Sequence, residues 1–378
     1  MAMSLLQGQC PVQCQLCEGN PKVKWKCLDC DLLMCSKCTD KVHSKFKSEK
    51  NHRIIDIKDV GQQSKGVDQQ DKEISGQPQA GEPSSQTNVE LINIKEYKTK
   101  MMDISLLAVS VDSSLWIGDG DEEKGFHPFT SPSALQNVKL VGDKIKFISS
   151  FNMRVYDIAV TPTNDILLAT GMAGGPRLKQ IKAGSNKVSD SIYFVELSYI
   201  KSVHVTKDGR VIVGGGNVVA VMDKDGKHLT RYERDKNNKL IFDGTIWSIT
   251  STINGNIFVV QTHSNPRVAV LGEEDVIYNY TGHPSINSHS AFDPQSVITT
   301  PMDNIIVADL CYDTLHILDN TGHQLTTYNT KDIGIEYPVS LTITMEGPFA
   351  VLYIGCYKMS YEDSSDTGRL YKMNIMGC

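Results

Sequence analysis

Long hydrophobic runs and a strong excess of either charge are both missing from this sequence of 378 residues. No apolar stretch approaches the roughly 18–20 residues that a membrane span requires. The first ten residues, MAMSLLQGQC, lack the basic and apolar regions of a secretory signal. We therefore expect a cytoplasmic protein without a membrane span, in a compartment where thiols stay reduced.

The net charge is only −6, and the excess of acid lies wholly in residues 91–378, which carry 26 Lys and Arg against 32 Asp and Glu. This balance differs from that of a non-specific nucleic-acid binder, which needs a basic surface.

Cysteine is scarce outside one short stretch. Seven of the ten cysteines lie in residues 10–38, and six of these form three Cys-x-x-Cys pairs, with two histidines following. Such a pair places two thiolates at the separation that a tetrahedral zinc ion requires. Eight ligands fill two four-coordinate sites and leave no position for water, so we expect two structural Zn²⁺ ions. The predicted ligands are Cys14, Cys17, Cys27, Cys30, Cys35, Cys38, His43 and His52.

The chain reads as three regions. Residues 10–58 form the predicted zinc finger, which has too few apolar residues to fold without metal. Residues 59–88 are rich in Gln, Gly, Ser and Pro and lack apolar heptads, so we expect a flexible linker rather than a coiled coil. Residues 89–378 form the third region, a repeat array.

In the repeat array a short apolar run, a turn of about four residues and a second apolar run recur six times. The first residues of the turns are spaced by 51, 45, 46, 48 and 44 residues, and each unit supplies about four strands. Four-stranded units of this period predict an all-β, six-bladed β-propeller. The turns begin at Ser110, Thr161, Thr206, Thr252, Thr300 and Thr344.

The last repeat lacks a fourth strand, and one strand-like segment, VELINIKEYKT at residues 89–99, is left over before the first repeat. We predict that this segment completes the last blade and closes the ring, which would remove an exposed sheet edge. Cys311 and Cys356 follow strand cores, and we expect both thiols to be buried.

The spacing C-x2-C-x9-C-x2-C-x4-C-x2-C-x4-H-x8-H, followed by RIIDI, resembles a B-box zinc finger that holds two zinc ions. That resemblance implies cross-brace pairing, in which Cys14, Cys17, Cys35 and Cys38 bind one ion and Cys27, Cys30, His43 and His52 bind the other. The spacing alone leaves sequential pairing open.

The segment PQSVITTPMDNIIVADLCYDTLHILDNTGHQL, residues 294–325, resembles an NHL repeat, so the whole chain resembles the tripartite-motif (TRIM)-NHL proteins. Two elements of that family are not found in this sequence. Only nine residues precede Cys10, too few for a RING domain, and residues 61–88 do not form a coiled coil.

We expect a non-catalytic, zinc-binding adaptor with protein partners, monomeric because a coiled coil is lacking. Two alternatives follow from the resemblance, a component of E3 ubiquitin ligation and a post-transcriptional regulator that binds RNA through the propeller. Residues 139–201 carry nine Lys and Arg against five acids, so an RNA or partner face would lie on the early blades. Its candidate residues are Lys144, Lys146, Arg177 and Lys179.

Overall fold

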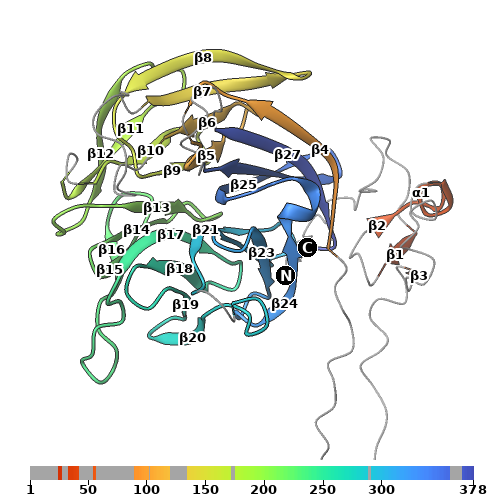
Figure 1. Ribbon diagram of the computed structural model, residues 1–378. Coiled ribbons are helices and arrows are strands. Elements are labelled where there is room, and N and C mark those ends of the chain that lie inside the picture. Colours follow the sequence, from red (N-terminus) through yellow and green to blue (C-terminus); the bar gives the residue numbers. More distant parts are fainter. Residues whose placement is uncertain are drawn as a thin grey trace, which may run out of the picture. The chain divides into compact units, whose positions relative to one another are not determined.

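The computed structural model describes residues 24–27, 33–41, 54–56, 89–101, 103–119, 134–171, 175–287, 291–357 and 368–378. The chain divides into two compact units, Met1–Pro83 and Ser84–Cys378 (Figure 1). The predicted linker, residues 59–88, lies outside the described residues. Within them, no helix is long and apolar enough to cross a membrane.

The described part of the first unit is a small sheet with one short helix. Its strands are β1 (Trp25–Cys27), β2 (Leu33–Met34) and β3 (Ile54–Asp56), and they pair in the order β2-β1-β3. Helix α1 (Ser36–Lys41) follows β2 after a single residue. Elements this short bury little surface, so they cannot hold this unit together by themselves.

The second unit consists of six four-stranded antiparallel sheets arranged as the blades of a propeller, which confirms the predicted fold. Blade 1 contains β5 (Leu106–Val109), β6 (Leu115–Gly118), β7 (Ala134–Val141) and β8 (Lys144–Asn152). Blade 2 contains β9 (Asp157–Val160), β10 (Ile166–Ala169), β11 (Arg177–Ile181) and β12 (Val188–Phe194). Blade 3 contains β13 (Ser202–Val205), β14 (Val211–Gly215), β15 (Val218–Met222) and β16 (His228–Tyr232).

The remaining blades follow the same plan. Blade 4 contains β17 (Thr245–Ser251), β18 (Ile257–Thr262), β19 (Arg267–Leu271) and β20 (Val276–Tyr280). Blade 5 contains β21 (Pro294–Thr299), β22 (Ile305–Asp309), β23 (Thr314–Leu318) and β24 (Gln324–Asn329), and the 3₁₀ turn η4 (Thr330–Ile333) follows it. Blade 6 contains β25 (Pro338–Glu346), β26 (Phe349–Cys356), β27 (Arg369–Met376) and β4 (Glu90–Lys98).

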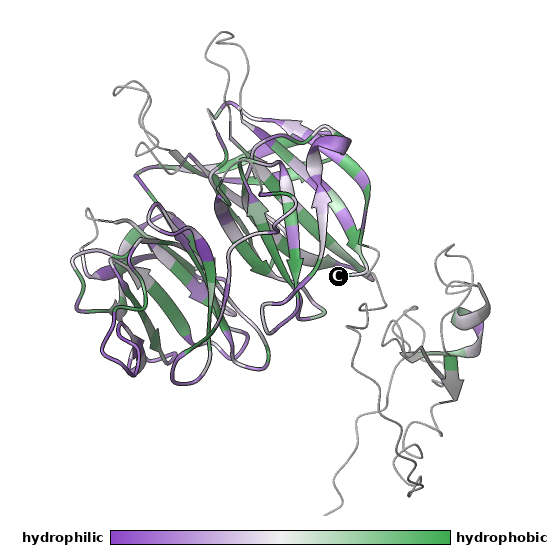
Figure 2. Ribbon diagram, turned by 60° about the horizontal axis from the view of Figure 1, so that its bottom comes forward, coloured by the Kyte–Doolittle hydropathy of each residue, from purple (hydrophilic) through white to green (hydrophobic). Residues whose placement is uncertain are grey.

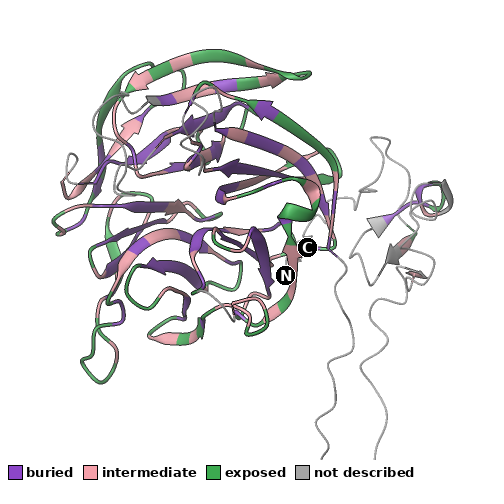
Figure 3. Cartoon of the chain, viewed as in Figure 1, coloured by how far each residue is buried: buried purple, intermediate pink, exposed green. Residues whose placement is uncertain are grey.

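The second strand of each blade forms the centre of the hydrophobic core. Every residue of β6, β10, β14, β18 and β22 is buried, as is the segment from Val351 to Cys356 of β26 (Figures 2 and 3). Both faces of these strands are covered by neighbouring blades, which explains why they read as continuous apolar runs. One apolar cluster fills each of the six interfaces between blades.

The turns between first and second strands have the chemistry that the sequence predicted. Their fourth residues adopt left-handed φ values between 61° and 92°: Ser113, Asn164, Gly209, Gly255, Asp303 and Gly347. Glycine, Asn and Asp tolerate this conformation best, and five of the six residues are of these types. In the first five turns this residue also donates its backbone N–H to the carbonyl of the first turn residue.

Blade 6 is built from both ends of the second unit, as predicted. Strand β4 pairs with β27 from Glu90↔Met376 to Lys98↔Arg369. Figure 1 shows β4 in orange beside β27 in blue. Tyr97 of β4 is 3% exposed and donates its hydroxyl to the carbonyl of Gly142 in blade 1 at 3.0 Å. The closing strand therefore connects blade 6 with blade 1.

Candidate functional site

Two of the predicted zinc ligands have described side chains. Cys35 lies just before α1 and Cys38 lies in its first turn, with exposed fractions of 5% and 4%. The backbone N–H groups of Cys38 and Thr39 both donate to the Cys35 carbonyl at 3.0 Å. The Thr39 hydroxyl donates to the same carbonyl at 3.1 Å. These bonds close a tight turn in which both thiols are buried, as in a Cys-x-x-Cys knuckle.

The rest of the predicted ligand set is only partly within the described structure. Cys27 lies on β1, although its side chain is not described, while Cys14, Cys17, Cys30, His43 and His52 lie outside the described residues. Beside the knuckle, Trp25 donates its indole N–H to the Ser36 hydroxyl at 3.3 Å, and Lys24 lies 4.8 Å from the Trp25 ring centre. The ligand pairing therefore stays a prediction.

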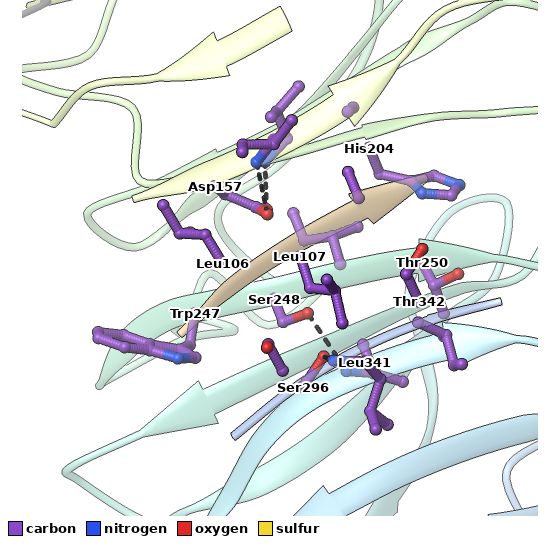
Figure 4. A pocket seen from close by; sticks show the side chains of 18 of the residues that line it. Leu106, Leu107, Asp157, His204, Trp247, Ser248, Thr250, Ser296, Leu341 and Thr342 are labelled. Atoms are coloured by element: carbon purple, nitrogen blue, oxygen red, sulfur yellow. Dashed lines mark hydrogen bonds between the residues drawn. The ribbon is translucent and has the colours of Figure 1, made fainter. Parts of the chain in front are cut away.

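The propeller encloses a central cavity of about 310 Å³. All six innermost strands line it, namely β5, β9, β13, β17, β21 and β25, and each of these strands contacts the next around the ring. Figure 4 shows side chains of the wall, in which leucines and Trp247 lie among Asp157, His204, serines and threonines.

In five of the six innermost strands a small polar side chain lies four residues before the first residue of the following turn. These residues are Asp157, Ser202, Ser248, Ser296 and Ser340, whereas blade 1 has Leu106 at this position, preceded by Ser105. Several of them bond to the next blade: the Val203 N–H donates to Asp157 Oδ2 at 2.9 Å, and the Val297 N–H donates to Ser248 Oγ at 3.2 Å. Likewise Ser296 Oγ accepts the N–H of Leu341 at 3.1 Å, while Ser340 Oγ donates to the Ile104 carbonyl at 2.6 Å. These four bonds link blade 2 with blade 3, blade 4 with blade 5, blade 5 with blade 6, and blade 6 with the segment that leads into blade 1, whereas the buried Ser202 Oγ has no hydrogen-bond partner among the described residues.

Two titratable groups of the cavity wall have shifted pKa values of opposite direction. Burial raises the pKa of Asp157 to about 7, although N–H donors from Val203 and Ile158 partly oppose the shift. Burial lowers the pKa of His204 to about 4, and its Nε2 lies 2.9 Å from Ser251 Oγ. Each neutral form is therefore favoured by folding.

These shifts predict opposing effects of pH on stability. The folded state binds more protons at Asp157 between about pH 4 and 7, so this group's contribution to stability is lost as pH rises through that window. The unfolded state binds more protons at His204 between about pH 6.5 and 4, so that group's contribution is lost as pH falls. Asp157→Asn should make stability rise with pH relative to the native chain, by about 1.4 kcal/mol per unit at most. His204→Gln should do the opposite.

Urea unfolding of the native chain and both variants at several pH values between 4 and 7 measures this. Differences in slope are the readout, because either substitution also changes a hydrogen bond and shifts stability at every pH. Parallel pH profiles for all three proteins would contradict the assignment.

One end of the cavity is bordered by a cation held between aromatic rings. The Lys201 ammonium lies 4.4 Å from the Trp247 ring centre and 5.2 Å from that of Tyr156, and Lys201 is 5% exposed. Arg154 lies 5.3 Å from the Tyr156 ring centre. These contacts join the starts of β9, β13 and β17 across three blades.

The structure places the four predicted RNA or partner residues on two different blades. Lys144 and Lys146 are exposed on β8, the outermost strand of blade 1. Arg177 and Lys179 lie on β11 of blade 2, where Lys179 pairs with Asp190. Arg177 donates to the Ser191 carbonyl at 3.0 Å and lies over Phe194. Their role as an RNA or partner face stays a prediction.

Sequence reasoning missed a buried polar network between blades 4 and 5. His316 and Asp309, both 0% exposed, lie 3.3 Å apart, and the Tyr280 hydroxyl lies 2.8 Å from the other imidazole nitrogen. Tyr280 also donates to Gln324, and Asn287 donates to Asp309, each at 2.8 Å. Asp309, His316 and Gln324 lie on three strands of blade 5, while Tyr280 and Asn287 precede that blade, and no recognisable motif connects them in the sequence.

Of the two thiols that we expected to be buried, only one is buried. Cys356 is buried, as predicted, at the end of β26, but Cys311 is exposed. The prediction for Cys311 was wrong because β22 ends at Asp309 and the chain has already entered a turn.

Comparison with known proteins identifies the first unit. Residues 14–54 match the ANCHR-like B-box zinc-binding domain, and this range contains all eight predicted ligands. No curated protein matches the chain. Among solved structures, a streptogramin B lyase is 14% identical with a TM-score of 0.48, covering 78% of this chain and 100% of its own.

The virginiamycin B lyase of Staphylococcus aureus is 12% identical with a TM-score of 0.48, covering 76% and 99%. A protein of unknown function from Bacteroides caccae is 14% identical with a TM-score of 0.44, covering 58% and 78%. Nothing about the activity of this chain follows from such distant likeness. The chain joins a B-box zinc-binding domain to a six-bladed β-propeller.

Proposed function

We propose that this protein is a non-catalytic adaptor, in which a zinc-stabilised B-box domain and a propeller bind different protein partners. The observation that carries the proposal is the B-box zinc-binding match over residues 14–54 in a chain whose second unit is a propeller. Domains of both kinds present broad surfaces made of turns and loops, which suit recognition. The finger holds two zinc ions in the cross-brace arrangement, and the chain acts as a monomer.

The cavity of the propeller supports a structural role for its polar groups. Asp157 accepts two backbone N–H bonds, and His204 contacts Ser251 in the next blade. Three serines of the same set are likewise bonded to neighbouring blades. These groups hold the innermost strands in place, so their hydrogen-bonding capacity is used by the fold rather than offered to a substrate.

The adaptor proposal predicts that the two units recruit separable sets of proteins. Proximity labelling compares the proteins labelled by three chains: the full native chain, the Cys35→Ser/Cys38→Ser variant, and the Cys311→Ser variant. The double substitution disrupts the knuckle, and Cys311→Ser is a control outside the finger. The double variant should lose one set of labelled proteins about tenfold and retain another set, whereas the control should lose neither.

The same set of labelled proteins from all three chains would contradict the proposal.

A second assay addresses catalysis. If the purified chain and a conjugating enzyme gave autoubiquitination without any added RING protein, the adaptor proposal would be wrong and the protein would be a ubiquitin ligase.

A further inference from the structure

One face of the propeller is formed by the turns that connect first and second strands. The innermost strands all run in the same direction around the cavity, so the six turns that follow them surround one end of it. Turns of this kind are normally polar, because Gly, Asn, Asp and Ser supply their conformation. The turns between third and fourth strands at the same end obey this, as in Asp223–Gly226 and Asp319–Gly322.

Large apolar side chains are instead exposed in three of the six turns and at the end of β25, just before the turn of blade 6. Val111 is 71% exposed, Ile253 68%, Met302 55% and Met345 51%. These residues belong to blades 1, 4, 5 and 6, which are consecutive around the ring. We call them the apolar arc.

Turn geometry does not explain the apolar arc. Proline is favoured early in such turns because its φ is fixed, which accounts for Pro162 and Pro301 in the turns of blades 2 and 5. Branched residues such as Val111 and Ile253 have no comparable advantage in a turn. A polar residue at these exposed positions would serve the fold equally well. The presence of apolar residues there in four consecutive blades therefore needs another reason.

Hydrogen bonds hold the two most exposed residues of the arc, Val111 and Ile253, against the turn of the next blade. The Ile253 N–H donates to Asp303 Oδ1 of the next turn at 2.8 Å. The Val111 N–H donates to Asn164 Oδ1 at 3.1 Å. Both acceptors are the left-handed residues of their turns, which fixes the positions of the side chains beside them.

The charge around the arc is acidic. The turns of blades 1, 4, 5 and 6 at this end contain no Lys or Arg. Three acids at this end are paired: Asp143 with Lys95 at 3.2 Å, Glu346 at the end of β25 with Lys372 at 2.8 Å, and Asp319 with His323 at 3.9 Å. Lys139 donates to the backbone carbonyl of Asp112 at 3.4 Å. The remaining acids are Glu273, Glu274, Asp275 and Asp303. The turns of blades 2 and 3 at the same end carry more Lys and Arg than acid, so the acidic charge coincides with the arc.

We propose that the apolar arc is a docking surface for a basic segment of a partner protein that carries large apolar side chains. This rests on the proposed adaptor function and names the chemistry of one partner. Apolar anchors would contact Ile253, Met302 and Met345, and basic residues would lie against the surrounding acids. An anionic membrane, RNA and a second copy of the same acidic face would all be repelled.

The test uses the purified full chain and defined probes. A short amphipathic peptide of Lys and Leu should bind, whereas its Glu and Leu counterpart should not. Ile253→Gln/Met345→Gln should weaken binding about tenfold by removing apolar contact without changing charge. Glu273→Gln/Glu274→Gln should weaken it and reduce its dependence on salt. Ile192→Gln is the matched control, because Ile192 is 57% exposed on the outermost strand of blade 2, which lies outside the arc.

Binding that is equal for both peptides, or that survives the substitutions in the arc, would overturn the proposal. So would stronger binding to anionic vesicles or single-stranded RNA, or self-association that the arc variant abolishes. The adaptor proposal is tested separately by the zinc knuckle variant, so either can fail while the other holds.

Discussion

Chelation of zinc should unfold the first unit and leave the unfolding of the propeller unchanged. The described sheet of the first unit has strands of only two or three residues, and among its described side chains Met34, Cys35 and Cys38 are buried. A core this small cannot offset the entropy of ordering the chain, so metal binding must supply the difference, typically about 10–16 kcal/mol for structural zinc. The propeller has an apolar cluster at each of six interfaces and needs no such contribution.

Hydrogen exchange measures both units in one experiment. After chelation the amides of β1 and α1 should exchange at the rate of an unfolded chain, while those of β14, β18 and β22 should keep their protection. Cys35→Ser should reproduce the effect without chelator, and Cys311→Ser should not. Loss of protection in both units together would show that they fold as one.

Removal of β4 should destabilise the propeller far more than removal of the whole first unit. A chain that begins at Ser84 keeps β4 and should unfold as the full protein does. A chain that begins at Thr99 loses Leu91 and Tyr97 from the clusters beside blade 6, and it exposes the edge of β27. Loss of two such core residues costs on the order of 5 kcal/mol, and the open edge favours aggregation.

A peptide of residues 88–99 added to the shorter chain provides the decisive control, because it can restore the missing strand. It should raise the thermal midpoint progressively as its concentration increases, whereas a peptide with Tyr97→Asp should not. Tyr97→Phe in the full chain loses only the bond to Gly142 and should cost about 1 kcal/mol. A shorter chain that melts like the longer one would show that β4 is dispensable.

The sequence predicted the blades because the turn residues are under strong local constraint. Asn164, Gly209 and Gly255 recur where a left-handed φ is required, and the apolar run after each turn is long enough to identify a buried strand. The leftover segment before the first repeat was sufficient to predict the closure. The zinc ligands could be predicted from the sequence equally well, because the Cys-x-x-Cys spacing reflects a local geometry. The family match spans the same residues.

The interior of the ring could not be predicted in the same way. Ser248, Ser296 and Ser340 are ordinary strand residues in the sequence, and their bonds to neighbouring blades depend on the register between segments 49, 45 and 236 residues apart. Asp157 and His204 are shifted by burial, which only the assembled cavity creates. The apolar arc likewise could not be predicted from the sequence, because its members are far apart along the chain, one in each of four blades.

The closing strand also determines how the protein would respond to mechanical load. The chain that leads to the first unit enters the propeller at Glu90, the residue of β4 that pairs with Met376 of β27. Tension applied through the first unit would reach the propeller first at the Glu90↔Met376 pair, which is the terminal pair of an edge strand. Blade 6 is therefore where the ring would yield first under tension.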